Sequence, residues 1–216
     1  MERSTIQFSS DNPDRSSIHV TQSISRANLL RRGAALAVAG GTVGVLADTA
    51  FADPISDQDL AYVRLLVTAE LLQSNFYSQA IAASVASPEV TKYLKRAYLN
   101  EQEHYQSVAG IISGTGNVPA ISSDINFSYP DGTFADEKSI LKAAAALETA
   151  VVSMYAGAMG GIVTNQFKTG IGQIAACEAQ HCSYLQTQTG GHPFWLSFPP
   201  SFTIQQASDA MNAYTT

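Results

Sequence analysis

Apolar residues recur at intervals of three and four positions in four long stretches of the chain, which is the period of an amphipathic helix. The repeating positions are Leu60, Val63, Leu66, Val67, Tyr77 and Ile81 in the first stretch; Leu94, Ala97, Val108 and Ile111 in the second; Leu141, Ala144, Val151 and Met159 in the third; and Ile171, Ile174 and Leu185 in the fourth. No stretch shows the sustained alternation of a strand. The pattern therefore predicts an all-α four-helix bundle over about residues 56–188.

Capping residues mark where these helices begin and end. Ser56, with Asp59 three residues on, and Ser87, followed by Pro88, can cap the first two helices. The third helix begins near Asp136 and the fourth around Thr169. Glycines mark the ends of the last three helices, at Gly114 and Gly116, at Gly160-Gly161 and at Gly190-Gly191.

Two segments outside the helices have distinct compositions. Residues 117–135 are polar and rich in turn formers, and their length suits a long crossover between the second and third helices. The tail, residues 189–216, combines prolines with aromatic residues and ends in a predicted short helix after Thr203, where Gln206 completes a capping box. We expect this tail to pack over the bundle, because exposing that many aromatic side chains would be unfavourable.

The first 52 residues resemble an export signal. A polar segment with five arginines precedes the uncharged, mostly apolar stretch 33–47, and Ala50-Phe51-Ala52 then forms a cleavage signature. A membrane-spanning helix needs about 20 apolar residues, so this stretch predicts a cleaved signal and no stable membrane anchor. The mature domain, residues 53–216, would lie in the periplasm, the cell envelope or outside the cell. The pair Arg31-Arg32 leaves both the twin-arginine and the general secretory route open.

Charge and cysteine content narrow the possible partners and crosslinks. The formal net charge is −6, which argues against binding to nucleic acid or to anionic membranes. Cys177 and Cys182 lie five residues apart in one predicted helix, so their Cα atoms would be about 8–9 Å apart. A disulfide needs less than about 7 Å, which excludes a bond between them within the helix. We interpret them as two small buried residues in preference to a metal or redox pair.

Each predicted helix places one glutamate on its apolar face: Glu70, Glu101, Glu148 and Glu178. Two of these glutamates are followed by a histidine on the same face three residues later, His104 and His181. Isolated buried charges are unfavourable, and no Lys or Arg stands three or four positions from any of the four glutamates. The alternatives are protonated carboxyl groups and histidines that serve only as core residues. Four carboxylates that converge with two imidazoles are better explained by two divalent metal ions.

The pattern also repeats within the chain. Glu70 precedes Glu101 by 31 residues and Glu148 precedes Glu178 by 30, and Tyr77 and Tyr155 each follow a lone glutamate by seven. The two helix pairs therefore look like halves of a pseudo-symmetric site. The two tyrosines are either hydrogen-bond donors to the ligands or ordinary core residues.

This order of one Glu, one Glu-x-x-His motif, one Glu and a second Glu-x-x-His motif resembles the ferritin-like di-iron and di-manganese carboxylate proteins. Residues 70–77, residues 146–148 and the Pro/Phe tail are similar to exported bacterial ferritin-like proteins related to desiccation-associated proteins, although Gln73 stands where that family has an acidic residue. The resemblance implies that Glu101 and Glu178 bridge two metal ions, that one histidine binds each ion, and that Glu70 and Glu148 are terminal ligands. Such oxygen-rich sites suit Fe or Mn.

Three functions are compatible with that expectation. The first is an oxidoreductase that reacts with O2 or peroxide, such as a ferroxidase or a peroxide-detoxifying protein. The second is a non-catalytic protein that binds metal and protects against desiccation or other stress. The third, an oxygenase for an organic substrate, would need an apolar pocket beside the metal ions. The sequence does not indicate an oligomeric state.

Overall fold

The computed structural model describes residues 7–8, 18–19, 55–193 and 196–215. The chain divides into two units, 1–46 and 47–216. In the first unit β1 (Gln7–Phe8) pairs antiparallel with β2 (Ile18–His19). The apolar stretch and the cleavage signature of the expected export signal lie outside the described residues, so export stays a prediction from the sequence.

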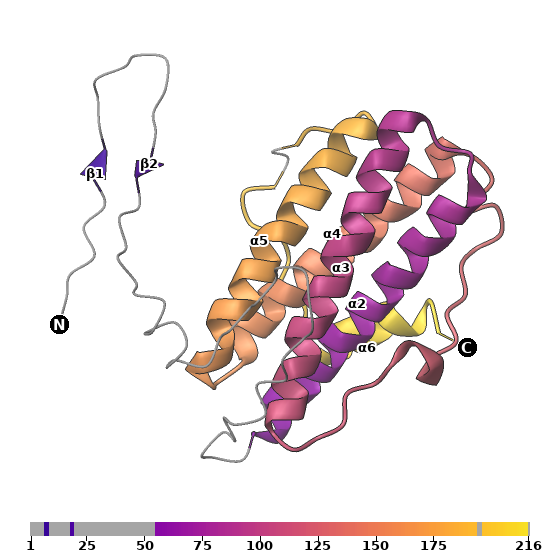
Figure 1. Ribbon diagram of the computed structural model, residues 1–216. Coiled ribbons are helices and arrows are strands. Elements are labelled where there is room, and N and C mark those ends of the chain that lie inside the picture. The colour runs from indigo at the N-terminus through magenta and orange to yellow at the C-terminus, as the bar shows by residue number, and fades with distance from the viewer. Residues whose placement is uncertain (1–6, 9–17, 20–54, 194–195, 216) are drawn as a thin grey trace, which may run out of the picture. The chain divides into compact units, whose positions relative to one another are not determined.

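The second unit is a bundle of four long helices, α2 (Asp57–Ala83), α3 (Pro88–Gly114), α4 (Glu137–Gly161) and α5 (Asn165–Gln188) (Figure 1). The helix α2 packs mainly on α3 and α4 mainly on α5, and contacts between α2 and α4 join the two pairs. A long crossover with one 3-10 turn, η1 (Ser122–Asp124), leads from α3 to α4, and the short helix α6 (Ile204–Asn212) packs against α2 and α4. The predicted all-α four-helix fold is confirmed.

Side-chain caps set most of the helix boundaries. Ser56 accepts a hydrogen bond from the Asp59 amide at 3.1 Å, and Ser87 and Asp136 cap α3 and α4 in the same way. The Asp59 carboxylate has a different role from the predicted one, because it accepts hydrogen bonds from the amides of Val163 (2.8 Å) and Thr164 (3.0 Å). These bonds hold the α4–α5 connection, so α5 begins at Asn165, four residues before the predicted Thr169.

The helix α4 is long and apolar enough to cross a membrane by length and composition. In the bundle, 67% of its most apolar window is buried, and its buried residues include Glu148. A core helix of a folded domain meets the same criteria of length and composition, and the burial of α4 identifies it as one.

The tail and the crossover attach to the bundle by backbone contacts. Phe202 donates its amide to the Ser153 carbonyl of α4 at 2.9 Å, and a Cβ at Gly157 would overlap the Phe202 carbonyl, so glycine permits this approach. The predicted capping box that starts α6 at Thr203 is present. The expectation that the tail aromatics pack over the bundle is wrong for Phe198, which is 88% exposed because the tail contacts the bundle on either side of it, at Pro193 and Phe202.

Candidate metal centre

All six residues predicted as ligands come together in the middle of the bundle. The helices α2 and α4 each supply one glutamate, Glu70 and Glu148, and α3 and α5 each supply a glutamate with a histidine one turn later. The four glutamates are 0% exposed, and His104 and His181 are 8% and 6% exposed. Because Glu103 lies between the motif residues and points away from the apolar face, it is exposed as its position on the helix requires.

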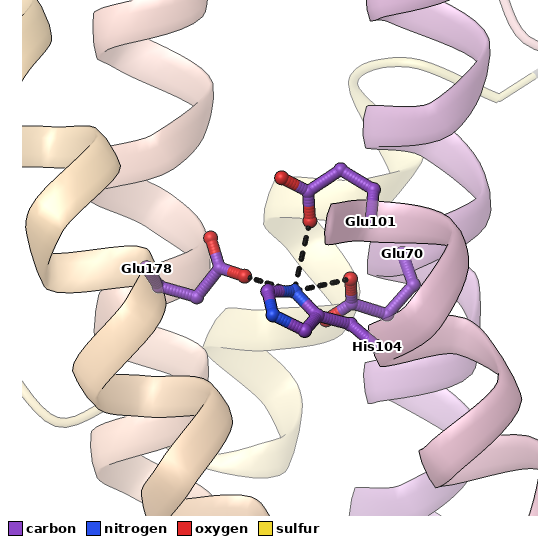
Figure 2. A group of neighbouring side chains, drawn as sticks. All are labelled: Glu70, Glu101, His104 and Glu178. Carbon is purple, nitrogen blue, oxygen red and sulfur yellow. Dashed lines mark hydrogen bonds and ion pairs between the residues drawn. The ribbon is translucent and has the colours of Figure 1, made fainter. Parts of the chain in front are cut away.

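His104 lies at the centre of one group of carboxylates. Its Nδ1 is 2.7 Å from Glu178 Oε1, 3.1 Å from Glu101 Oε2 and 3.5 Å from Glu70 Oε2. Figure 2 shows these three carboxylates pointing toward the same edge of the imidazole ring from three different helices. One nitrogen and three carboxylate oxygens therefore face a common point.

His181 has a matching group on its own side. Its Nδ1 is 3.0 Å from Glu101 Oε1, 3.4 Å from Glu148 Oε1 and 3.7 Å from Glu178 Oε2. Glu101 and Glu178 thus belong to both groups and turn one oxygen toward each histidine. The ligand atoms of the six residues form two sets of four residues, and both sets contain Glu101 and Glu178. This arrangement is compatible with a dinuclear metal site.

Several buried polar atoms in this cluster lack a hydrogen-bond partner, although they lie close to charged groups. Within the described part of the chain, the buried side-chain atoms without one are Glu70 Oε2, Gln73 Oε1, Glu101 Oε1, Glu178 Oε1 and His181 Nδ1. Buried polar atoms without partners are rare and need an explanation. Four of the five are carboxylate or imidazole ligand atoms that face a common centre, so the donor set fits hard or borderline divalent cations.

The pKa values of the cluster residues show that positive charge stabilises the buried carboxylates. Burial raises the pKa of Glu70 to about 8 and raises that of Glu178. Burial also opposes ionisation of Glu101, but its close contacts with the His104 and His181 imidazoles outweigh it and lower the pKa to about 2. Burial disfavours the charged form of both histidines, yet contacts with Cys177 and the surrounding carboxylates raise their pKa values. The protons on these groups occupy the place that cations would take.

A family model described as a ferritin-like domain matches residues 58–191, which cover the four helices and all six cluster residues. The chain belongs to the ferritin-like family. No curated protein gives a significant match to it. Membership of the ferritin-like family agrees with the order of the glutamates and histidines along the helices, and it establishes the family without a subfamily or an activity.

Two tyrosines connect the halves of the ferritin-like centre crosswise. Tyr77 donates its hydroxyl hydrogen to Glu148 Oε1, and Tyr155 donates to Glu70 Oε1. Each tyrosine follows one lone glutamate along its helix and binds the other one. Both rings are fully buried, and burial raises both hydroxyl pKa values. The structure therefore decides between the two interpretations of these tyrosines: they are hydrogen-bond donors to the cluster.

Gln73 contributes to the centre, which sequence reasoning missed. It is fully buried, and its amide nitrogen donates to Glu148 Oε2 at 2.9 Å and Glu178 Oε2 at 3.3 Å. The residue at this position therefore contacts two of the candidate ligands directly. The available signal was its place one turn after Glu70 on the same helix face.

Asn100 and Cys177, each directly before a Glu-x-x-His motif, were also missed. Asn100 Nδ2 lies 3.0 Å from His181 Nε2, and Cys177 Sγ lies 3.8 Å from the same nitrogen. The interpretation of Cys177 and Cys182 as buried is wrong, since both are partly exposed free thiols. The histidine contacts lower the pKa of Cys177 to about 6. Both residues face the outer side of the His181 ring, where they can fix its orientation.

Proposed function

We propose that this protein holds two Fe or Mn ions and reacts with O2 or hydrogen peroxide. Glu101 and Glu178 would bridge the ions, and His104 and His181 would each bind one. The remaining two glutamates, Glu70 and Glu148, would be terminal ligands. One observation carries the proposal: each bridging glutamate turns a separate oxygen toward each histidine.

The surroundings of the cluster favour a small oxidant over an organic substrate. The ligand carboxylates are fully buried, and the partly exposed side chains that touch the ligands on the α3–α5 side include Asn100 and Cys177. A pocket of about 500 Å³ lies at the crossover, lined by Gln79 and residues 127–135, none of which belongs to the cluster. These features support O2 or peroxide as the reactant.

The residues around the metal ions have separable tasks. Bound Fe or Mn would supply the one-electron chemistry. Glu70 must lose its proton to become a ligand, and its raised pKa would fall beside the positive charge of bound cations. Tyr77 and Tyr155 hold the two terminal carboxylates in place, and Gln73 orients Glu148 and Glu178. The apolar core excludes bulk water from the site.

The reaction can be tested with protein loaded anaerobically with two equivalents of Fe(II). On mixing with O2 or hydrogen peroxide, we expect oxidation of the bound Fe(II), followed by stopped-flow absorbance, to be at least roughly tenfold faster than in His104→Ala/His181→Ala. Glu103→Gln changes an exposed residue on α3, the helix that carries His104, and this variant should react like the unmodified protein. Tight metal binding without faster oxidation would favour the non-catalytic, stress-protective alternative and contradict the proposal.

A further inference from the structure

A line of three tyrosines, Tyr77, Tyr93 and Tyr184, leads from one end of the cluster toward the protein surface. Tyr77, which donates to Glu148, has its hydroxyl oxygen 3.3 Å from that of Tyr93 on α3, with the ring centroids 6.3 Å apart. Tyr93 stacks on Tyr184 of α5 at 4.1 Å between centroids and 23° between planes. Tyr77 is fully buried, whereas Tyr93 and Tyr184 are partly exposed. The line therefore runs without interruption from a ligand carboxylate to solvent.

The other end of the pseudo-symmetric centre lacks this line. Tyr93 lies eight residues before Glu101, and the position eight residues before Glu178 is Gly170. Tyr184 lies three residues after its motif histidine, and the position three after His104 is Ser107. Those two residues also face each other, since a Cβ on Gly170 would lie 3.9 Å from Ser107 Oγ. The paired positions exist at both ends, but aromatic rings occupy them at one end only.

Core packing explains the rings but not the hydroxyl groups. Stacked and edge-to-face aromatic pairs are favourable by themselves, and phenylalanine would give the same ring contacts. A phenol differs because it can give up an electron when its proton has an acceptor. Tyr77 has such an acceptor in Glu148, and its oxygen lies within reach of the Tyr93 hydroxyl group. The two hydroxyl groups thus form a path along which protons can move when electrons move between the tyrosines.

We propose that Tyr77, Tyr93 and Tyr184 form a one-sided route by which electrons from a soluble one-electron donor reach the metal centre. The inference rests on the proposed function, with hydrogen peroxide as the oxidant. Tyr77 gives an electron to the centre and its phenolic proton to Glu148. Tyr93 replaces that electron and passes its own proton to the Tyr77 oxygen. Tyr184 replaces the electron of Tyr93 through the stacked rings and releases its own phenolic proton to water. The donor then returns an electron to Tyr184 at the surface, and solvent protons restore the hydroxyl groups of Tyr184 and Tyr93.

The overall reaction is complete after two electrons have passed along the route. Two electrons enter at Tyr184 from two molecules of a donor such as ascorbate, each of which also releases one proton to the solvent, and two protons pass from the solvent to the centre. At the centre they reduce one H2O2, its O–O bond breaks, and two H2O form. The metal ions return to their starting state, and each tyrosine regains its electron and proton.

The route can be tested by trapping radicals on the loaded protein. Fe(II)- or Mn(II)-loaded protein receives hydrogen peroxide and a nitroso spin trap, and peptide mass spectrometry locates the adducts. We expect adducts on Tyr184 in the unmodified protein and a loss of roughly tenfold or more in Tyr93→Phe, which keeps the ring packing. Tyr98→Phe, also partly exposed on α3 but off the line, should keep the adducts. Reduction by ascorbate after peroxide should slow in Tyr93→Phe and in Tyr184→Phe.

Metal content and peroxide consumption, measured in the same samples, separate the possible failures. If metal binds and peroxide is consumed but Tyr93→Phe retains its Tyr184 adducts, the electron route is refuted and the proposed function stands. If the loaded protein consumes no peroxide, the route fails, and the proposed function fails as well if the loaded protein does not react with O2 either. Circular dichroism of Tyr93→Phe and Tyr184→Phe shows whether each variant keeps the helical fold, and either folded variant is sufficient for the test.

Discussion

The two ends of the metal centre have matching ligands and different surroundings. At each end a histidine faces three carboxylates, and a tyrosine from the opposite half binds the terminal glutamate. At the His181 end, Gln73 donates to two of those carboxylates, whereas the equivalent position after Glu148 is the buried Val151. The tyrosine line is likewise confined to the His181 end.

Under the proposed function, this difference separates the residues that would hold metal from those that would serve its reaction. A two-ion site requires two similar ligand sets, so the ligands follow the internal repeat of the chain. Exchange of electrons with the outside requires only one path, and additional hydrogen bonds can stabilise one end without the other. Departures from the repeat, such as Gln73 where the other half has Val151, are therefore the positions at which we expect the two ends to differ in the proposed function.

Metal removal should produce the largest change in stability. In the metal-free protein the folded-state pKa of Glu70 is about 8, above its ordinary value of 4.5. The folded state then holds more protons than the unfolded state, so stability falls as pH rises from about 5 to 8, by about 3 kcal/mol for this group. The raised histidine pKa values act in the same direction above about pH 6.5. Urea unfolding of chelator-treated protein at several pH values measures the effect.

The corresponding controls test whether this pH dependence comes from the cluster. Glu70→Gln should remove the part of the pH dependence that Glu70 contributes, because the glutamine cannot ionise, while Glu103→Gln should preserve all of it. Metal-loaded protein should not lose stability over this pH range, since bound ions favour the folded state. A metal-free protein whose stability stays level from pH 5 to 8 would show that these carboxylates are not held close together.

Gln73 provides a smaller test of the difference between the two ends. Gln73→Met keeps a similar volume but removes the donor to Glu148 and Glu178, so the metal-free protein should lose about 1–3 kcal/mol of stability at neutral pH. Gln102→Met removes a comparable hydrogen bond to Tyr98 on the exposed side of α3 and should change stability by less than about 0.5 kcal/mol. Equal effects of the two changes, measured by urea unfolding, would mean that Gln73 has no special role in the cluster.

The sequence could predict the features that depend on one helix at a time. The three- and four-residue period placed Glu101 with His104 and Glu178 with His181 on buried faces, and the caps at Ser56 and Ser87 were predicted from local residue types. Spacing along one chain does not reveal which residues meet across helices. The crossed tyrosine bonds and the stacking of Tyr93 on Tyr184 therefore appeared only in the structure.

Contacts that depend on the path of loops were also beyond prediction. Asp59 looked like part of a local capping box, but the α4–α5 connection brings two backbone amides to its carboxylate. The exposure of Phe198 follows from where the tail attaches to α4, at Phe202. Residue type gave no signal for either arrangement.

The most direct test of the central claim is the number of metal ions bound per chain, measured by elemental analysis after reconstitution with Fe(II) or Mn(II). We expect about two ions in the unmodified protein and in Glu103→Ala, and loss of both in Glu178→Ala, because this carboxylate faces both histidines. Unmodified protein that binds no metal, or Glu178→Ala protein that keeps two ions, would contradict the claim that the two sites share their carboxylates.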